Sequence, residues 1–295
     1  MSETDPARQP DPSIDSRNTR KDTWNPTQYQ RFQDERSRPF FELMALVQIR
    51  PEMRVADLGC GTGELTKTLH RHLHARETLG LDSSPAMLDK AHAHAGEGLR
   101  FQAGDIWAFA RQSVSPASPA PSASPAPSAP DGALYDLIFS NAALQWVEDH
   151  PALLERLSAR LSDGGQLAVQ VPANGDHPSH IAAAAVAREE PFHTALEGHV
   201  RIFPILTPEG YASLLDRLGF TQQHVRLQVF GHQLAAREDV IEWVKGTLLT
   251  DYQKRLPPDL WTRFLDRYRE LLLPRLQDSH PFFYPFKRIL FWGQK

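Results

Sequence analysis

A glycine-rich turn is the first feature of this sequence that could do chemistry. It follows an apolar run that contains Asp57, precedes a helix-like stretch, and has glycine on alternate positions, at Gly59, Gly61 and Gly63. Glycine inside a regular element costs roughly 0.5–1 kcal/mol relative to alanine, so three together need a reason. A turn without side chains lets a ligand reach the main chain, and the next helix offers free N–H groups. The spacing differs from the G-x-G-x-x-G of dinucleotide sites, and the adjacent acid favours an ammonium-bearing ligand over a pyrophosphate.

Two more acids end the strand-like runs that follow. Asp82 in GLDSSP ends the second run, and Asp105 in AGDIW ends the third. A carboxylate at the end of the second strand can accept hydrogen bonds from ribose hydroxyls. Asp105 could accept from an adenine amino group, with Ile106 against the ring. Any one of these acids could be a simple turn or cap residue, but three at consecutive strand ends behind a glycine turn favour a nucleoside site.

The elements that must bring these residues together alternate along the chain. Strand-like apolar runs cover residues 54–59, 77–82, 99–105, 135–142 and 165–172, and helix-like stretches lie between them. This alternation predicts an α/β fold with a mostly parallel, doubly wound sheet. Strand-like runs at 223–234 and 286–295 bring the expected strand number to seven. Helix-like segments between these last two runs would form a cap at the edge where ligands bind in open α/β sheets.

The predicted organisation has four parts. They are a disordered polar tail (1–23), a core (24–235) with a Pro/Ser/Ala-rich insertion (113–132), a helical substrate cap (236–280) and a last core strand (281–295). Alternating Pro, Ser and Ala can bury little surface, so the insertion should be exposed and have no catalytic part.

Composition narrows the function classes. The 295-residue chain has a formal net charge of −4 and no dense Lys/Arg run, which argues against a nucleic-acid partner. No apolar run reaches the ~20 residues of a membrane helix, so we expect no membrane partner. Cys60 is the only cysteine, which excludes an intrachain disulfide and fits the cytoplasm. His70 and His74 lack further ligands at a zinc-like spacing, so we expect no metal. We also expect a monomer.

Four stretches resemble the class I S-adenosylmethionine-dependent methyltransferases: VADLGCGTGELT (55–66), GLDSSPAML (80–88), GDI (104–106) and YDLIFSNAALQWV (135–147). The lead-in at 24–45 and the LAVQVP run at 167–172 are similar to the trans-aconitate methyltransferases. The resemblance implies a Rossmann-like fold and S-adenosylmethionine as cofactor. It also implies which residues contact each part of this cofactor. The methionine part would contact Gly59, Cys60, Gly61, Gly63 and Asn141, and its ammonium group would contact Asp57. The ribose would contact Asp82 and Ser83, and the adenine would contact Asp105 and Ile106.

The implied reaction is an in-line transfer of the methyl group to an oxygen of a small carboxylate, trans-aconitate or a related acid. A carboxylate with a pKa near 4 is already ionised at pH 7, so no catalytic residue is expected beyond those that position the substrates. Acceptor binding is expected from cationic and aromatic side chains, namely Arg36, Arg38, Trp146 and His150.

One feature departs from the trans-aconitate pattern. The stretch WVKGTLLTDYQKRLP lacks the arginine of a GLRP-like segment, which leaves open an acceptor that is another small metabolite. A non-catalytic cofactor-binding module also remains open, because it would carry the same turn and acids. An adenine-DNA methyltransferase is disfavoured because SNAALQW lacks the prolines and stacking aromatic of that motif, and an NAD oxidoreductase is disfavoured by the glycine spacing.

Overall fold

The computed structural model describes residues 37–112 and 134–295. The predictions for the tail (1–23), for Arg36 and for the insertion (113–132) therefore lie outside the described residues. Residues 37–44 are helical. The strands are β1 (Arg54–Leu58), β2 (Glu77–Asp82), β3 (Leu99–Ala103), β4 (Tyr135–Asn141), β5 (Leu161–Pro172), β6 (Gln222–Leu234) and β7 (Phe282–Gln294).

The helices alternate with these strands in the first two thirds and cluster in the last third. They are α2 (Glu64–His72), α3 (Pro85–Ala91), α4 (Ile106–Arg111), α5 (His150–Ala159), α6 (Pro178–Val186), α7 (Phe192–Ala195), α8 (Pro208–Arg217), α9 (Asp239–Lys245), α10 (Leu248–Arg255) and α11 (Pro258–Leu272). Short 3-10 turns are η1 (His92–His94), η2 (Leu144–Trp146) and η3 (Leu273–Arg275). Within the described residues, no helix is long and apolar enough to cross a bilayer.

One sheet of seven strands runs through the fold in the order β3-β2-β1-β4-β5-β7-β6. Strands β1 to β5 pair in parallel, and β7 is antiparallel to both of its neighbours. The predicted α/β class, the doubly wound topology and the seven strands are confirmed. Strand order reverses between β1 and β4, where open α/β sheets bind their ligands.

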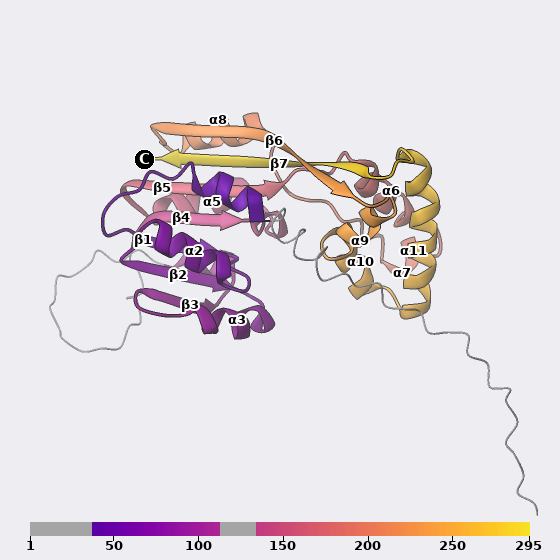
Figure 1. Cartoon of the computed structure of the whole chain (residues 1–295), viewed down its shortest axis with the longest axis horizontal. Helices are drawn as coiled ribbons and strands as arrows, with labels where there is room; N and C mark the ends of the chain where they lie inside the picture. The colour runs from indigo at the N-terminus through magenta and orange to yellow at the C-terminus, as the bar shows by residue number, and fades with distance from the viewer. Residues whose placement is uncertain (1–36, 113–133) are drawn as a thin grey trace, which may run out of the picture. The chain divides into compact units, whose positions relative to one another are not determined.

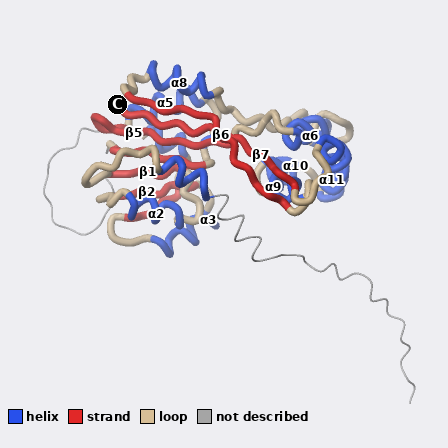
Figure 2. The backbone as a smooth tube through the Cα atoms, turned by 45° about the horizontal axis from the view of Figure 1, so that its top comes forward, coloured by secondary structure: helices blue, strands red, loops and turns tan. Residues whose placement is uncertain are grey.

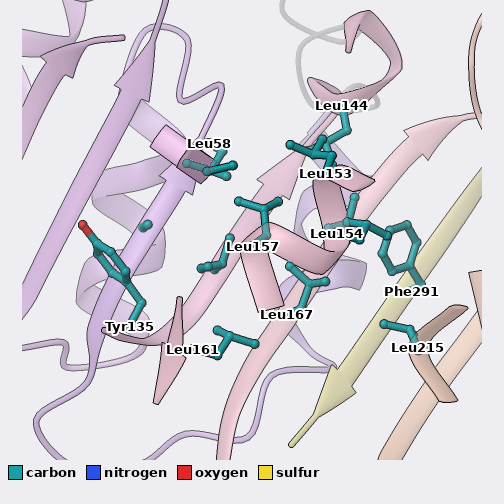
Figure 3. Close-up of a cluster of buried hydrophobic side chains, with 14 of the residues drawn as sticks. Leu58, Tyr135, Leu144, Leu153, Leu154, Leu157, Leu161, Leu167, Leu215 and Phe291 are labelled. Carbon is teal, nitrogen blue, oxygen red and sulfur yellow. The ribbon is translucent and has the colours of Figure 1, made fainter. Parts of the chain in front are cut away.

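Both faces of the sheet are covered by apolar layers. On one face, leucines of α5 pack against β4 and β5, as Figure 3 shows for Leu153, Leu154 and Leu157. All three are fully buried, which stabilises the fold by roughly 1.5–3 kcal/mol each. On the opposite face, Phe40 of the 37–44 helix and Leu69 of α2 join the cluster that covers β1 and β4. Packing on both faces fixes the strand ends as a rigid edge.

The parallel strands end at one edge, and this edge collects the candidate residues. Asp57 of β1 pairs with Phe139 of β4, and Asn141 of β4 pairs with Gln170 of β5. Asp82 is the last residue of β2. The topology therefore brings side chains from four parts of the sequence to one edge of the sheet.

Strands β6 and β7 continue past this edge. Pro172, the last residue of β5, pairs with Arg288, so residues 282–287 of β7 and their β6 partners extend beyond it. Helices α6, α9, α10 and α11 gather around this extension (Figures 1 and 2), with α11 packed on α6 and α10 on α9. The helices between β6 and β7 thus lie on the carboxyl side of the parallel strands.

Candidate functional site

The three glycines of the turn after β1 all adopt positive φ angles, +80° at Gly59, +56° at Gly61 and +77° at Gly63. Their surroundings differ. A Cβ on Gly59 would lie 2.2 Å from the Cβ of Ala143, and one on Gly63 would lie 2.7 Å from the Phe101 ring. A Cβ on Gly61 would meet no atom of the described part of the chain within 4 Å. Gly59 and Gly63 are therefore required for packing. Gly61 leaves an open surface of bare main chain on which a ligand can lie.

Asp57 is a buried carboxylate behind this turn. It is 3% exposed, and its Oδ2 accepts a 2.6 Å hydrogen bond from the Thr66 hydroxyl. Burial raises the pKa of Asp57 to about 7; the Thr66 bond opposes this rise, and the negative charge of Asp82 adds to it. A buried carboxylate with one partner is stabilised by a cation placed beside it. The predicted ammonium contact fits this environment.

Asp82 connects the turn after β1 to the turn after β2. Its Oδ2 accepts a 2.8 Å hydrogen bond from the Gly61 N–H, and its Oδ1 accepts one of 2.9 Å from the Ser84 N–H. Each carboxylate oxygen can accept a second hydrogen bond, so Asp82 holds the loop and remains able to accept from hydroxyls. Ser83, which follows Asp82 in the chain, is exposed.

The remaining residues proposed to contact the cofactor have clear local roles. Asp105 caps α4, because its Oδ1 accepts a 2.9 Å bond from the Ala108 N–H. Ile106 is partly buried against the core below α4. Cys60 is 8% exposed in an apolar cluster, and burial, with the charges of Asp57 and Asp82, raises the pKa of its thiol well above the usual range. The thiol therefore stays protonated.

At the end of β4 and in the turn after it, two buried oxygens have no hydrogen-bond partner among the described residues. They are Oδ1 of Asn141 and Oε1 of Gln145. The Gln145 Nε2 is occupied, since it donates to the Ala142 carbonyl at 2.7 Å. Buried acceptors without partners are costly in a finished core, so both oxygens fit a ligand that brings N–H donors. The sequence predicts a cofactor contact at Asn141 but not at Gln145, whose only signal is a polar residue within the NAALQW stretch.

Of the four residues expected to bind the acceptor, the three that the structure describes have separate partners. The Arg38 side chain is 65% exposed, lies 3.7 Å from Glu42 and sits over the Phe230 ring at 5.8 Å. His150 is 1% exposed, with Nδ1 2.6 Å from the Tyr211 hydroxyl and Nε2 2.9 Å from the Leu144 carbonyl. These partners hold η2 and α8 to the start of α5. Arg36 lies outside the described residues.

Trp146 is exposed and belongs to a second cluster of residues. Its ring lies under the guanidinium of Arg201 at 4.4 Å. Arg201 lines a pocket of about 360 Å³ between α6 and residues 200–205, together with Asn174, His180 and Arg188. The sequence does not predict Arg188 or Asn174 as site residues, because only folding brings them to the segment of residues 200–205.

Comparisons with known proteins agree with this geometry. A family model described as a methyltransferase domain matches residues 29–225. The chain belongs to this methyltransferase family. It is 45% identical over 278 residues to a trans-aconitate 2-methyltransferase of Deinococcus radiodurans, covering 91% of this chain and 97% of that protein. It is 36% identical to a trans-aconitate 2-methyltransferase of Variovorax paradoxus, covering 90% and 94%.

Among solved structures, the YcgJ protein from Bacillus subtilis superposes on this methyltransferase with a TM-score of 0.51. The two are 17% identical, and the match covers 86% of this chain and 97% of the other. This likeness shows a shared fold. The resemblance found in the sequence is confirmed: the chain is an S-adenosylmethionine-dependent methyltransferase.

The residues of this methyltransferase fit S-adenosylmethionine. The open surface at Gly61 suits a ligand lying on main chain, and the unpartnered oxygens of Asn141 and Gln145 suit its ammonium. Asp57, whose pKa is raised by burial, suits the same positive charge. The expected assignments of the individual contacts remain proposals.

Proposed function

We propose that this methyltransferase transfers a methyl group from S-adenosylmethionine to a carboxylate oxygen of trans-aconitate or a closely related acid. One observation carries the proposal: the identity of 45% to a trans-aconitate 2-methyltransferase extends over 97% of that protein. A match of this length includes the C-terminal helices as well as the cofactor half. The enzyme is expected to act as a cytoplasmic monomer on a small molecule rather than on nucleic acid.

In the proposed mechanism the protein binds and orients the reactants. Bound S-adenosylmethionine supplies an electrophilic methyl group on a positively charged sulfur. Asp57, Asn141 and Gln145 would hold its ammonium, Asp82 its ribose hydroxyls, and Asp105 with Ile106 its adenine. The acceptor carboxylate is ionised at pH 7, so its oxygen attacks without a general base. Catalysis then depends on alignment and on removing water from the carboxylate, and no single side chain is chemically essential.

We also propose that residues 236–280 form a cap over the acceptor. The segment that carries Arg201 is held by α10, because the Tyr252 hydroxyl accepts a 2.9 Å bond from the Arg201 N–H. His199 Nε2 lies 2.6 Å from Asp251 Oδ2, a second contact between this segment and α10. These contacts support a role for the C-terminal helices in shaping the acceptor side.

The test is methyl transfer from labelled S-adenosylmethionine to a panel of acids containing trans-aconitate, citrate, itaconate and a fatty acid. We expect trans-aconitate to be converted to its monomethyl ester, identified by mass, with the highest kcat/KM of the panel. Asp57→Ala should lose most of this activity, and Arg156→Gln, an exposed change on α5, should not. Cofactor binding without transfer to any acid would instead support a non-catalytic module. Methyl transfer only to a different metabolite would show that the proposed acceptor is wrong.

A further inference from the structure

The pocket of about 360 Å³ beside α6 combines apolar walls with two arginines. Ile181, Val200 and Phe203 contribute apolar surface, and Arg188 and Arg201 contribute positive charge. Its volume falls in the range of small-molecule sites, which are mostly apolar with a few placed polar groups. A small acid with a hydrocarbon backbone matches this combination.

Arg201 is held in place before any ligand arrives. Its guanidinium lies 4.4 Å from the Trp146 ring centre and 4.8 Å from that of Phe203. Its Nη2 donates to the Gln145 carbonyl at 3.3 Å, and its main-chain N–H donates to the Tyr252 hydroxyl. Two rings and one hydrogen bond hold the planar guanidinium, and the main-chain bond to Tyr252 holds the backbone that carries it, so little conformational entropy is lost when the guanidinium binds a carboxylate.

No carboxylate neutralises this arginine. Among the described residues, none lies within ion-pair distance of Arg201 or Arg188, and the buried Nε of Arg201 has no hydrogen-bond partner. Asp251 is the acid whose charge acts most on Arg201, but its carboxylate is already bonded to His199 and Arg255. A half-buried cation without a counter-ion is costly to desolvate, and an anionic ligand offsets that cost.

The other polar groups of the pocket add no positive charge. Burial lowers the pKa of His180 to about 4, so its ring is neutral at pH 7. The Asn174 amide is occupied, since it donates to the Tyr284 hydroxyl and accepts from the Lys287 N–H. The Arg188 side chain, just after α6, donates to the Ala184 carbonyl at 2.9 Å and is exposed. The two arginines therefore determine that the pocket favours a negatively charged ligand.

The pocket is connected to the cofactor turn through one residue. Gln145 accepts from Arg201 through its main-chain carbonyl, donates to Ala142 through Nε2, and has the unpartnered Oε1 assigned above to the cofactor. Ala142 directly follows Asn141 at the end of β4. Two hydrogen bonds, through Gln145, therefore connect Arg201 to Ala142 in the turn after β4.

We propose that this pocket binds the carboxylates of the acceptor that are not methylated, with Arg201 as the fixed partner and Arg188 as the adjustable partner at the rim. The inference rests on the proposed function and deepens it, because it makes Arg201 a specificity residue for di- and tricarboxylic acids. A monocarboxylic acid would leave Arg201 without a partner and would bind less tightly. The pocket thereby selects the substrate by the number of its negative charges.

The test measures binding without turnover. Calorimetry with S-adenosylhomocysteine present compares trans-aconitate with crotonate for the wild type, Arg201→Gln, Arg201→Lys, Arg188→Gln and the control Arg156→Gln. We expect wild type and control to bind trans-aconitate at least tenfold more tightly than crotonate. Arg201→Gln should weaken trans-aconitate binding at least tenfold and leave crotonate nearly unchanged, with Arg201→Lys and Arg188→Gln intermediate. Affinity for S-adenosylhomocysteine should stay the same in all variants.

The outcomes separate this inference from the proposed function. If the wild type methylates trans-aconitate and the Arg201 and Arg188 variants bind it as tightly as the control, the pocket assignment is wrong and the function stands. If trans-aconitate binds in an Arg201-dependent way without being methylated, the pocket stands and the function is wrong. If the wild type binds no acid, both are overturned. Arg188 is exposed, so its variant keeps the test valid should Arg201→Gln fail to fold.

Discussion

The sharpest prediction compares alanine at Gly59 with alanine at Gly61. Both positions have positive φ, at +80° and +56°, so each substitution carries a left-handed strain of roughly 1–2 kcal/mol. Only at Gly59 does the new Cβ meet a neighbour, the Ala143 Cβ at 2.2 Å. Carbon atoms prefer about 3.5–4.0 Å, so the turn after β4 would have to move by more than about 1 Å.

The magnitudes follow from this difference. Overpacking of this kind costs typically about 1–3 kcal/mol, so Gly59→Ala should be less stable than Gly61→Ala by that amount. For a domain of this size the difference corresponds to a melting temperature lower by about 3–10 °C. Gly61→Ala should instead weaken S-adenosylhomocysteine binding at least tenfold, because its Cβ enters the open surface assigned to the cofactor.

Circular dichroism monitors the thermal unfolding of the unliganded protein, and calorimetry measures its affinity for S-adenosylhomocysteine. Gly246→Ala is the matched control, because Gly246 has a φ of −76° and nothing within 4 Å of an added Cβ; it should change neither measurement. Equal melting temperatures for the Gly59 and Gly61 variants would refute the packing argument. Wild-type affinity in Gly61→Ala would refute the assigned cofactor surface.

Three further predictions concern the polar side chains of Asp57, Asp82 and His150. The pKa of Asp57, about 7 in the folded protein, exceeds its ordinary value of 3.8. Between these two pH values the folded state therefore binds more protons than the unfolded state. The free energy of unfolding of the unliganded protein should fall as pH rises from about 4 to 7, by at most about 1.4 kcal/mol per pH unit. Urea unfolding should show this slope, and Asp57→Asn should remove it. Asp82→Ala should weaken S-adenosylmethionine binding at least tenfold by calorimetry; unchanged affinity would exclude the ribose assignment. His150→Phe should destabilise the protein by about 1–3 kcal/mol in urea, because it removes two buried hydrogen bonds, to the Tyr211 hydroxyl and to the Leu144 carbonyl, at about 0.5–1.5 kcal/mol each. A raised KM for the acid at unchanged stability would instead support the acceptor role expected from the sequence.

The cofactor side of the site could be predicted from sequence because it depends on short-range pattern. Glycines on alternate positions require a turn, and acids at the ends of parallel strands must meet at one edge whatever packs around them. The start of α8 obeys a local rule of the same kind, because Thr207 caps the helix and its Oγ1 accepts a 3.1 Å hydrogen bond from the Gly210 N–H. Such local rules do not separate a structural role from a binding role. Asp105, for example, is predicted to contact the ligand, and its side chain also caps α4.

The acceptor side could not be predicted in the same way. The Arg201 guanidinium lies over the Trp146 ring, and the pocket that Arg201 lines lies between α6 and a segment that precedes α8. No periodicity or spacing in the sequence relates these residues. His150 shows the same limit: its sequence context suggested a substrate contact, and its ring nitrogens meet Tyr211 and Leu144 inside the core. Whether a polar side chain faces a pocket or a core depends on which helices pack over it.

The sequence by itself determined the α/β class, the glycine turn and the edge of the sheet where the acids gather, because these depend on strand periodicity and on the backbone freedom of glycine. The tertiary structure alone decided that Gly61 faces open space, that Gln145 keeps an oxygen without a partner, and that Arg201 lies fixed between two rings. These features arise from side chains far apart in the chain, and their environment exists only once the helices have packed on the sheet.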